Sequence, residues 1–296
     1  QLFADVVLAN QDYVDLILSD AYTHNTYYMG TVDDNNHVNF YDGKIRVTDP
    51  EGNEFVKYDA KDYAEHISEH VEPWSYLKFP YLKNVGWKGF VDGIDSGVYC
   101  ATPLSRLNAS DGMATPKAQE AFEKFYETLG SEKVNGRYKP IHHRLATHWA
   151  RLVELLYAAE RMLELSQDPE ITDPNVRAPI TEVPDEGIGS VEAPRGTLTH
   201  HYKTDGNGML TDVNLIVGTT NNYAPINMSV MKAADALIKK GTVITDGLLN
   251  KIEMAFRNYD PCMSCATHSL PGQMPLEVTI RDADGNQVQT LSQYID

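Results

Sequence analysis

Residues 260–268 decide how the rest of the chain is interpreted, and they read Asp260-Pro261-Cys262-Met263-Ser264-Cys265-Ala266-Thr267-His268. Two of the three cysteines of the chain lie here, separated by two residues. Such a pair can present two thiolates to a soft metal, and the histidine three positions later adds a further possible ligand. A lone Cys-x-x-Cys pair is also typical of zinc half-sites and redox pairs. The stretch therefore predicts a thiolate site without identifying its metal.

The same stretch resembles the C-terminal nickel-binding motif of the [NiFe] hydrogenase large subunit, Asp-Pro-Cys-x-x-Cys-x-x-His. Three further stretches support the resemblance. Glu192-Ala193-Pro194-Arg195-Gly196 looks like the family's Glu-Ala-Pro-Arg-Gly segment, and Val217-Gly218-Thr219-Thr220-Asn221-Asn222 stands in the place of its Pro-Ser/Thr-Thr-rich loop. A long helical stretch around Arg144–Leu165 also fits the family. Residues 1–268 resemble the C-terminal part of such a large subunit. The sequence is most similar to cytoplasmic archaeal F420-non-reducing (methyl-viologen-reducing) enzymes that pass electrons to heterodisulfide reductase.

One departure from the family concerns its second cysteine pair, Arg-x-Cys-Gly-x-Cys, near the N-terminus of the large subunit. No such motif occurs here, and the remaining cysteine, Cys100, has no neighbouring thiol in the sequence. This chain alone is therefore not expected to assemble a four-thiolate site. The missing part either belongs to a separate polypeptide, has been lost, or lies outside this sequence.

The resemblance implies particular ligands. Cys262 resembles the terminal nickel ligand, and Cys265 resembles the cysteine that bridges nickel and an iron carrying CO and cyanide. His268 resembles the last residue of the mature family protein, which ligates a separate magnesium or iron ion. The alternatives are a zinc half-site or two buried thiols for the cysteines, and a surface position for the histidine.

The resemblance also implies a set of residues around the metals. Arg195, in a Pro194–Gly turn, would lie over the open face of the metal pair, where it would stabilise cyanide or act as a base, and Asp260 would fix its guanidinium. Thr219 and Thr220 would donate hydroxyl hydrogen bonds to a cyanide, and Pro194 completes this cofactor-binding set. A glycine replaces the family's proline before Thr219, which puts the local backbone geometry in question. A structural salt bridge and turn-capping threonines are the alternatives.

Two adjacent histidine pairs invite a metal interpretation that we do not adopt. His200 and His201 lie on a predicted strand, so their side chains point to opposite faces. His142 and His143 precede a predicted helix, where such residues are more often solvated or capping. Neither pair is expected to ligate a metal.

Composition limits the classes of function. The 296 residues carry a formal net charge of -17, which argues against nucleic acid and against an anionic membrane surface. No apolar run approaches the roughly 20 residues of a membrane span, and three cysteines do not make a disulfide framework. A reducing cytoplasm is the expected setting. Apolar residues in 2–19 have helical spacing, so the chain opens inside a helix and is expected to be a piece of something longer.

The expected fold class is α+β, predominantly α-helical, as in the [NiFe] hydrogenase large subunit, with a small β-rich insert at about 36–58. Residues 38–41 and 44–48 flank Asp42-Gly43, a hairpin signal. The longest helix is expected at 141–166, and a short helix is expected at 59–71, followed by an irregular packed segment at 73–82. A helix capped by Thr245 or Asp246 is expected to run into Asp260-Pro261. Strands are expected around 196–203 and 210–217, and a small β-hairpin around Asp284-Gly285-Asn286. We expect one domain at 1–268 and a C-terminal extension at 269–296 that resembles the peptide removed by a maturation protease after nickel insertion.

The expected function is reversible heterolytic cleavage of H2 at a Ni–Fe centre. The resemblance implies that an Fe–S small subunit is the electron partner and that another polypeptide supplies the second cysteine pair. One alternative is a catalytically silent scaffold like the related complex I subunit. The others are an apo precursor without nickel and a zinc-binding accessory protein.

Overall fold

The computed structural model describes residues 10–177, 179, 181–262 and 276–293. Contacts between residues divide the chain into two units, Gln1–Asp260 and Pro261–Asp296. The predicted division after His268 falls outside the described residues and stays a prediction.

The main unit is built around strand β1, which is buried along its whole length. It belongs to a six-stranded sheet in the order β4-β3-β1-β2-β8, with β7 also pairing with β1. The strands are β1 Tyr27–Val32, β2 His37–Val38, β3 Lys44–Thr48, β4 Glu54–Tyr58, β7 Tyr99–Cys100 and β8 Gly112–Met113. A two-stranded sheet of β9 Lys133–Val134 and β10 Arg137–Tyr138 lies outside it.

The predicted hairpin around Asp42-Gly43 is wrong, because β3 pairs with β1 and β4 and not with β2. Gly43 does not have the positive φ that a two-residue hairpin turn of this type requires. A Cβ at Gly43 would instead lie 2.2 Å from the carbonyl oxygen of Val32. The glycine therefore permits a close approach to β1, and the hairpin forms between β3 and β4.

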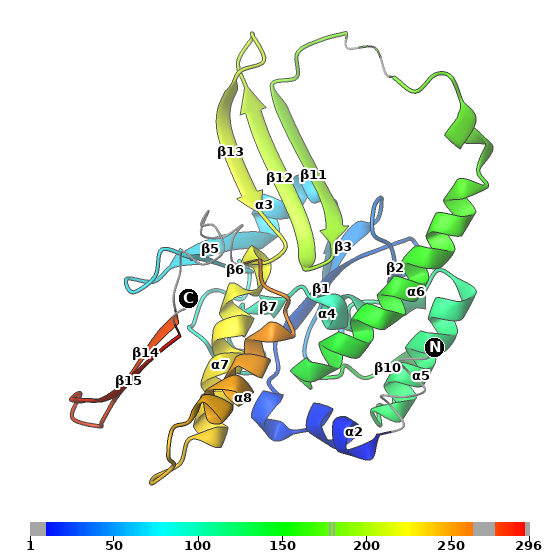
Figure 1. The fold of residues 1–296 in the computed structure, drawn as a ribbon. Coiled ribbons are helices and arrows are strands. Elements are labelled where there is room, and N and C mark those ends of the chain that lie inside the picture. The colour runs from blue at the N-terminus through cyan, green and yellow to red at the C-terminus, as the bar shows by residue number, and fades with distance from the viewer. Residues whose placement is uncertain (1–9, 178, 180, 263–275, 294–296) are drawn as a thin grey trace. The chain divides into compact units, whose positions relative to one another are not determined.

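Helices cover this sheet and contain most of the core (Figure 1). They are α2 Gln11–Ile17, α4 Pro103–Asn108, α5 Pro116–Thr128, α6 Thr147–Ser166, α7 Tyr223–Leu237 and α8 Asp246–Arg257, with 3-10 turns η1 Asp20–Tyr22, η3 Arg144–Ala146, η4 Pro169–Thr172 and η5 Thr220–Asn222. Trp149 and Val153 of α6 pack with Phe125 of α5 and Leu104 of α4. The predicted long helix is thus confirmed from Thr147, and the predicted cap of α8 is confirmed, since Thr245 accepts from Leu248 N–H.

Two short segments differ from the sequence prediction. The helix expected at 59–71 ends early, because 3-10 turn η2 Ala60–Asp62 and helix α3 Tyr63–His66 lead into β5 Ile67–Val71. Strand β5 pairs in antiparallel register with β6 Lys78–Leu82, within a stretch that the sequence left irregular. Cross-strand pairing supplies backbone partners that a local sequence pattern does not reveal.

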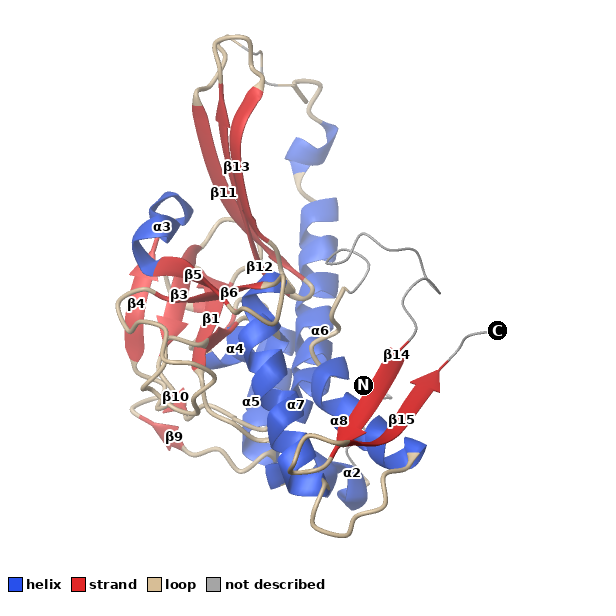
Figure 2. Ribbon diagram, turned by 90° about the vertical axis from the view of Figure 1, so that its left-hand side faces the viewer, coloured by secondary structure: helices blue, strands red, loops and turns tan. Residues whose placement is uncertain are grey.

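A three-stranded antiparallel sheet completes the main unit. It consists of β11 Glu186–Ala193, β12 Gly196–Thr204 and β13 Leu210–Ile216. Strands β12 and β13 were predicted, whereas β11 was not, because Gly187 and Gly189 interrupt its apolar pattern. Figure 2 shows this sheet between α3 on one side and α6 on the other. The α+β class is confirmed, with more strand than the single predicted insert.

The second unit is a hairpin of β14 Leu276–Arg281 and β15 Gln287–Gln293. Its turn contains Gly285 at a φ of 84°, as the Asp284-Gly285-Asn286 signal predicts. No helix within the described residues is long and apolar enough to cross a membrane.

Candidate active site

A two-residue turn joins β11 to β12 and carries Arg195. Ala193 and Gly196 are paired across the two strands, so that Pro194 and Arg195 form the turn between them. The predicted Glu-Ala-Pro-Arg-Gly segment is therefore a hairpin tip. Because the turn is short, it fixes the direction in which the Cα–Cβ bond of Arg195 leaves the backbone.

Three side chains from three different elements hold the backbone carbonyls of this turn. Arg106 of α4 donates to the Ala193 carbonyl at 2.9 Å, and Arg151 of α6 donates to the Pro194 carbonyl at 3.0 Å. Asn222, at the end of η5, donates to the Arg195 carbonyl at 2.8 Å. Each peptide plane of the turn is thus fixed by a separate contact, which limits the conformations open to Arg195.

A buried ion-pair cluster lies beneath the turn. Arg106 makes a bidentate pair with Glu154 and reaches Glu192 Oε2 at 2.9 Å, and all three side chains are almost fully buried. The other oxygen of Glu192 accepts from Thr31 N–H at 2.7 Å, from the Thr31 hydroxyl and from the Thr197 hydroxyl. Burial opposes the charge of Arg106, but the two adjacent carboxylates raise its pKa above the ordinary value. Buried charges need such complete pairing.

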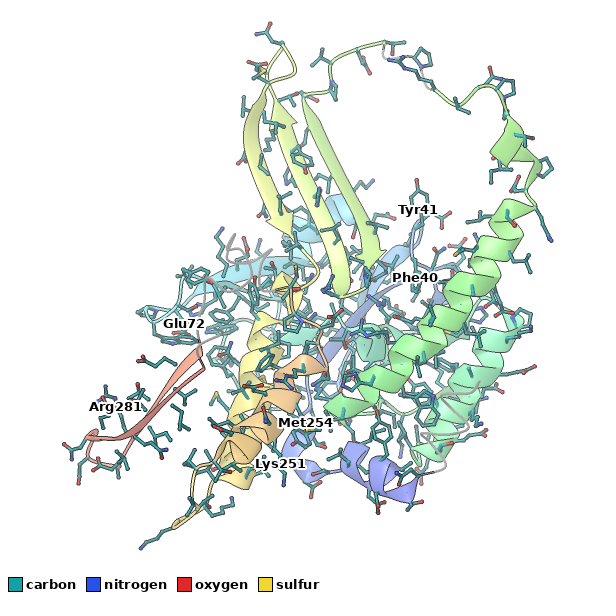
Figure 3. All side chains as sticks on the ribbon, viewed as in Figure 1. Phe40, Tyr41, Glu72, Lys251, Met254 and Arg281 are labelled. Atoms are coloured by element: carbon teal, nitrogen blue, oxygen red, sulfur yellow. The ribbon has the colours of Figure 1, made fainter. Side chains whose placement is uncertain are left out.

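Phe40, labelled in Figure 3, lies against this cluster. The Arg106 guanidinium lies 5.6 Å from the centre of the Phe40 ring, and that ring packs edge-on against Tyr157 of α6 at 4.8 Å. The Phe40 carbonyl accepts from Glu192 N–H at 2.8 Å. The aromatic cover keeps water from the ion pairs, which strengthens them.

Gly196 ends the turn at a position where no side chain fits. Its φ is +153°, and a Cβ there would lie 2.5 Å from the Ala101 carbonyl oxygen and 2.6 Å from the Gly218 carbonyl oxygen. The glycine therefore lets the turn lie against two other backbone segments. One of them is the 217–222 segment, so the structure brings together two of the stretches singled out in the sequence.

The guanidinium of Arg195 is bound to Asp260. Its Nε lies 2.6 Å from the Asp260 carbonyl oxygen and 3.3 Å from Oδ2 of the same residue. Asp260 has a φ of 50°, uncommon for a non-glycine residue, and this conformation turns both oxygens toward Arg195. Nη1 of Arg151 lies 4.0 Å from Asp260 Oδ2. The carboxylate thus lies within reach of two guanidinium groups.

Arg195 keeps part of its donor capacity. Its side chain is 38% exposed, and its only hydrogen bonds and ion pairs to other described residues are made by Nε. A guanidinium carries five N–H donors. The outer edge of the group is therefore available to bind an anionic or polar group.

The predicted threonines lie in the segment that touches the turn. Thr219 is buried at the start of η5. Thr220 is partly exposed and hydrogen-bonds the Tyr223 side chain. Burial raises the pKa of the Tyr223 phenol, and the hydrogen bond from Thr220 acts to lower that pKa. Asn222 links the segment to the turn, because its Nδ2 also donates to the Gly218 carbonyl at 3.2 Å. The backbone at Gly218, where the family has proline, is thus held by contacts of its own.

The predicted metal ligands are only partly within the described residues. Cys262 stands two residues after Asp260 and is disulfide-bonded in the structure, whereas a metal ligand is the reduced thiolate. Cys265 and His268 lie outside the described residues. Among the residues that are described, no group of three or more His, Cys, Asp or Glu could hold a metal ion.

Cys100 lies near the turn but not as a second ligand pair. It is a free, buried thiol whose sulfur is 3.5 Å from Asn222 Oδ1. The chain thus offers Cys262 and Cys265 as its one close cysteine pair, half of the thiolates that a Ni–Fe centre uses. The guanidinium–carboxylate pair fits the surroundings of such a centre, and the thiolate set is incomplete within this chain.

The histidine pairs make local contacts. His200 contacts the Tyr202 hydroxyl and His201 contacts the Tyr63 hydroxyl and Glu186, while His142 contacts the Tyr28 hydroxyl and His143 the Thr23 hydroxyl. That neither pair ligates a metal stays a prediction.

The sequence assigned no role to the residues that hold the turn. Arg106 belongs to no motif that we identified, Arg151 and Glu154 lie within the predicted long helix, and Asn222 ends the 217–222 stretch. A charged residue inside the otherwise apolar stretch Pro103–Asn108 is a signal of a buried ion pair, as is Arg151-x-x-Glu154 on the predicted core helix. Neither signal names the partner.

Comparisons with known proteins agree with this fold. The family described as nickel-dependent hydrogenase matches residues 16–268. An iron-sulfur subunit of the F420-non-reducing hydrogenase of Archaeoglobus profundus is 52% identical over 99% of this chain and 59% of its own length. The corresponding protein of the F420-non-reducing hydrogenase of Methanothermobacter thermautotrophicus is 41% identical over 90% of this chain and 53% of its own.

A solved structure shows the same arrangement of the chain. An NAD+-reducing [NiFe]-hydrogenase in the H2-reduced state superposes with a TM-score of 0.76 and 35% identity, covering 90% of this chain and 55% of that chain. The fold thus defines a protein of the [NiFe] hydrogenase large-subunit class. The chain belongs to the nickel-dependent hydrogenase family, and the predicted similarity to archaeal F420-non-reducing enzymes is confirmed. It spans somewhat more than half the length of the curated relatives that it matches.

Proposed function

We propose that this chain is the part of a [NiFe] hydrogenase large subunit that carries Cys262, Cys265 and the Arg195–Asp260 pair. The enzyme would convert H2 reversibly into protons and electrons. The observation that carries the proposal is the fixation of Arg195 on Asp260, two residues before the cysteine pair. The three successive carbonyls held in this hairpin tip support the same placement of the guanidinium.

The residues of the chain have distinct tasks in this proposal. Cys262 and Cys265 would hold the nickel–iron centre together with two thiolates from further polypeptide, and His268 would hold a magnesium or iron ion. When bound, the centre supplies the polarising metals that heterolytic cleavage of H2 requires. Thr219, Thr220 and Pro194 would line the side where the iron carries its CO and cyanide.

Arg195 would act through its charge and its free N–H edge. Because Nε is engaged with Asp260, the remaining N–H groups are directed by the pair and present a positive charge without reorganisation. A planar guanidinium can donate two parallel hydrogen bonds, which an ammonium cannot. Arg195→Lys is therefore expected to lower H2 oxidation by about a hundredfold or more, while nickel content stays unchanged.

The remaining parts of the proposal concern the assembly. An Fe–S small subunit would exchange electrons with the centre, and the relatives are indeed named as subunits. The cytoplasm would be the location, and a maturation protease would remove residues 269–296. The division into domains at His268 is proposed on the same ground.

Metal analysis of the complete native assembly tests the function. We expect about one nickel per copy of the chain, with iron, because two thiolates from this chain and two from elsewhere complete the site. Cys262→Ser and Cys265→Ser should each abolish nickel retention. Absence of nickel from the wild-type assembly would instead indicate a silent scaffold or a precursor, and zinc bound by the chain alone would indicate an accessory protein.

A further inference from the structure

Helix α6 is apolar on two sides, and only one of them is covered. The inner side packs in the core through Trp149, Ala150, Val153 and Tyr157. The outer side carries six apolar residues. Two of them, Leu152 and Leu156, are partly buried. The other four are exposed: Leu155, Ala159, Met162 and Leu163. A helix that is apolar on both sides is normally buried on both.

These six residues, here called the outer stripe, have the spacing of a helix-packing seam. Leu152, Leu155, Ala159 and Met162 are separated by three, four and three residues, which is the a/d pattern of a heptad. Leu156 and Leu163 widen the seam on one side. The small side chain of Ala159 at its centre permits close approach of a second helix.

The outer stripe is a large uncovered feature of the main unit. Met162 is 71% exposed, Leu155 64% and Leu163 60%. The start of α5 contacts α6 at Glu160, whose carboxylate accepts from Ala118 N–H at 3.0 Å. Figure 1 shows the end of α6 beyond this contact, with no other described helix laid along it. Contiguous apolar patches of this kind mark interaction surfaces.

Charge beside the stripe indicates what its partner carries. The segment that directly follows α6, residues 168–173, carries three exposed carboxylates, Asp168, Glu170 and Asp173, and no basic residue. An occupant with basic residues next to its apolar seam would complement this edge and be attracted to it.

The length of the relatives indicates where the partner comes from. The Archaeoglobus profundus protein matches almost all of this chain, yet the match covers 59% of that protein. The remaining part, about two-fifths, has no counterpart here. The same holds for the NAD+-reducing enzyme, of which 55% is covered.

We propose that the outer stripe of α6 docks an amphipathic helix of the polypeptide that corresponds to this unmatched part. The docked helix has an apolar a/d seam and a basic flank. This inference rests on the proposed function, because the same polypeptide would bring the second cysteine pair. Docking on α6 joins that polypeptide to the helix that also holds the Arg195 turn through Arg151 and Glu154.

Binding measurements with a defined probe test the proposal. The probe is a recombinant polypeptide that covers the unmatched part of the Archaeoglobus profundus relative, titrated into the full chain by calorimetry. We expect the wild-type chain to bind, with hydrogen-exchange protection of residues 152–166. The double variant Leu155→Glu/Met162→Glu should weaken binding by at least about tenfold.

The control is Val243→Glu, which introduces the same charge at a residue that is 77% exposed between α7 and α8. It should bind the probe like the wild type. If the double variant loses its fold, Ala159→Trp obstructs the seam without adding charge and should weaken binding similarly.

Several outcomes would overturn the proposal: no binding by the wild-type chain, equal binding by the stripe variants, or self-association of the chain alone that the double variant abolishes. The last result would make a second copy the occupant. Failure of the proposed function can be distinguished from failure of the docking proposal. If the assembly bound the probe but retained no nickel, the function would be refuted and the docking surface would stand. If the double variant bound the probe as well as the wild type and its assembly still retained nickel, the docking surface would be refuted and the proposed function would stand.

Discussion

At the scale of single residues, Gly196 shows how the site depends on the absence of a side chain. A Cβ at this position would meet two backbone carbonyl oxygens, of Ala101 and Gly218, which cannot move as a flexible side chain would. We expect Gly196→Ala to destabilise the chain by about 1–3 kcal/mol and to displace Arg195 from Asp260. Thermal unfolding measures the first effect and H2 oxidation by the assembly the second.

Gly187→Ala is the matched control for this substitution. Gly187 lies in β11 of the same sheet, and a Cβ there would have nothing within 4 Å. Alanine should be neutral or stabilising by roughly 0.5 kcal/mol, since it reduces the backbone entropy lost on folding. Equal destabilisation by both alanine variants would contradict the close-contact argument.

His142 makes the stability of the chain depend on pH. Burial, the Arg144 guanidinium and His143 lower its pKa to about 4, and only Asp92 opposes them. The unfolded chain therefore takes up the proton first, near the ordinary pKa of 6.5. Stability is full above that value and is lost as the pH falls toward 4.

Urea unfolding at pH 7 and pH 5 measures this dependence. His142→Asn keeps an acceptor for the Tyr28 hydroxyl, which now bonds Nδ1, and it removes the titration. The variant should lose less stability between the two pH values than the wild type does. A wild type whose midpoint does not change between them would contradict the argument, as would a variant with an undiminished slope.

At the scale of elements, the sequence predicts what local periodicity and capping determine. Helix α6, helix α8 with its Thr245 cap, strands β12 and β13 and the hairpin β14–β15 follow from such patterns. The pairing of β3 with β1 did not, because Gly43 serves a long-range contact with Val32 and not a turn. The family motifs pointed to Arg195 and Asp260 and included Asn222 without a role, whereas Arg106 and Glu154 act across the fold and leave no local pattern.

Asn222 connects two elements, the Arg195 turn and the 217–222 segment, through its side-chain hydrogen bonds. Its amide donates to the Arg195 carbonyl, and its oxygen accepts from Ala101 N–H at 2.8 Å. Asn222→Asp keeps the shape but replaces the donor by a charge facing two carbonyl oxygens. We expect a loss of about 1–3 kcal/mol or more in unfolding free energy and reduced activity with nickel retained.

Asn227→Asp is the comparison for that prediction. Asn227 is also a helix residue of this region, but its amide donates only to the Tyr223 carbonyl, one turn earlier in α7. Its replacement should cost less stability and leave H2 oxidation unchanged. If both variants impaired activity alike, the role of Asn222 as a joint would be refuted.

At the scale of the whole molecule, the division into Gln1–Asp260 and Pro261–Asp296 separates the core from the predicted metal ligands. The predicted ligands belong to the smaller unit, whereas the core and the Arg195 turn belong to the larger one. A two-stranded hairpin contributes little independent stability in water. Removal of residues 269–296, which the family resemblance assigns to maturation, is therefore expected to leave the main unfolding transition unchanged.

Calorimetry of the full chain and of a chain ending at His268 tests this prediction. The two should unfold at the same temperature, because the truncation removes none of the buried residues that form the core clusters. The Arg195 turn should stay intact, since Asp260 and every side chain that holds the turn precede the cut. A clearly lower unfolding temperature for the shortened chain would show that the tail stabilises the main unit, and cleavage would then alter the folded body as well as the metal loop.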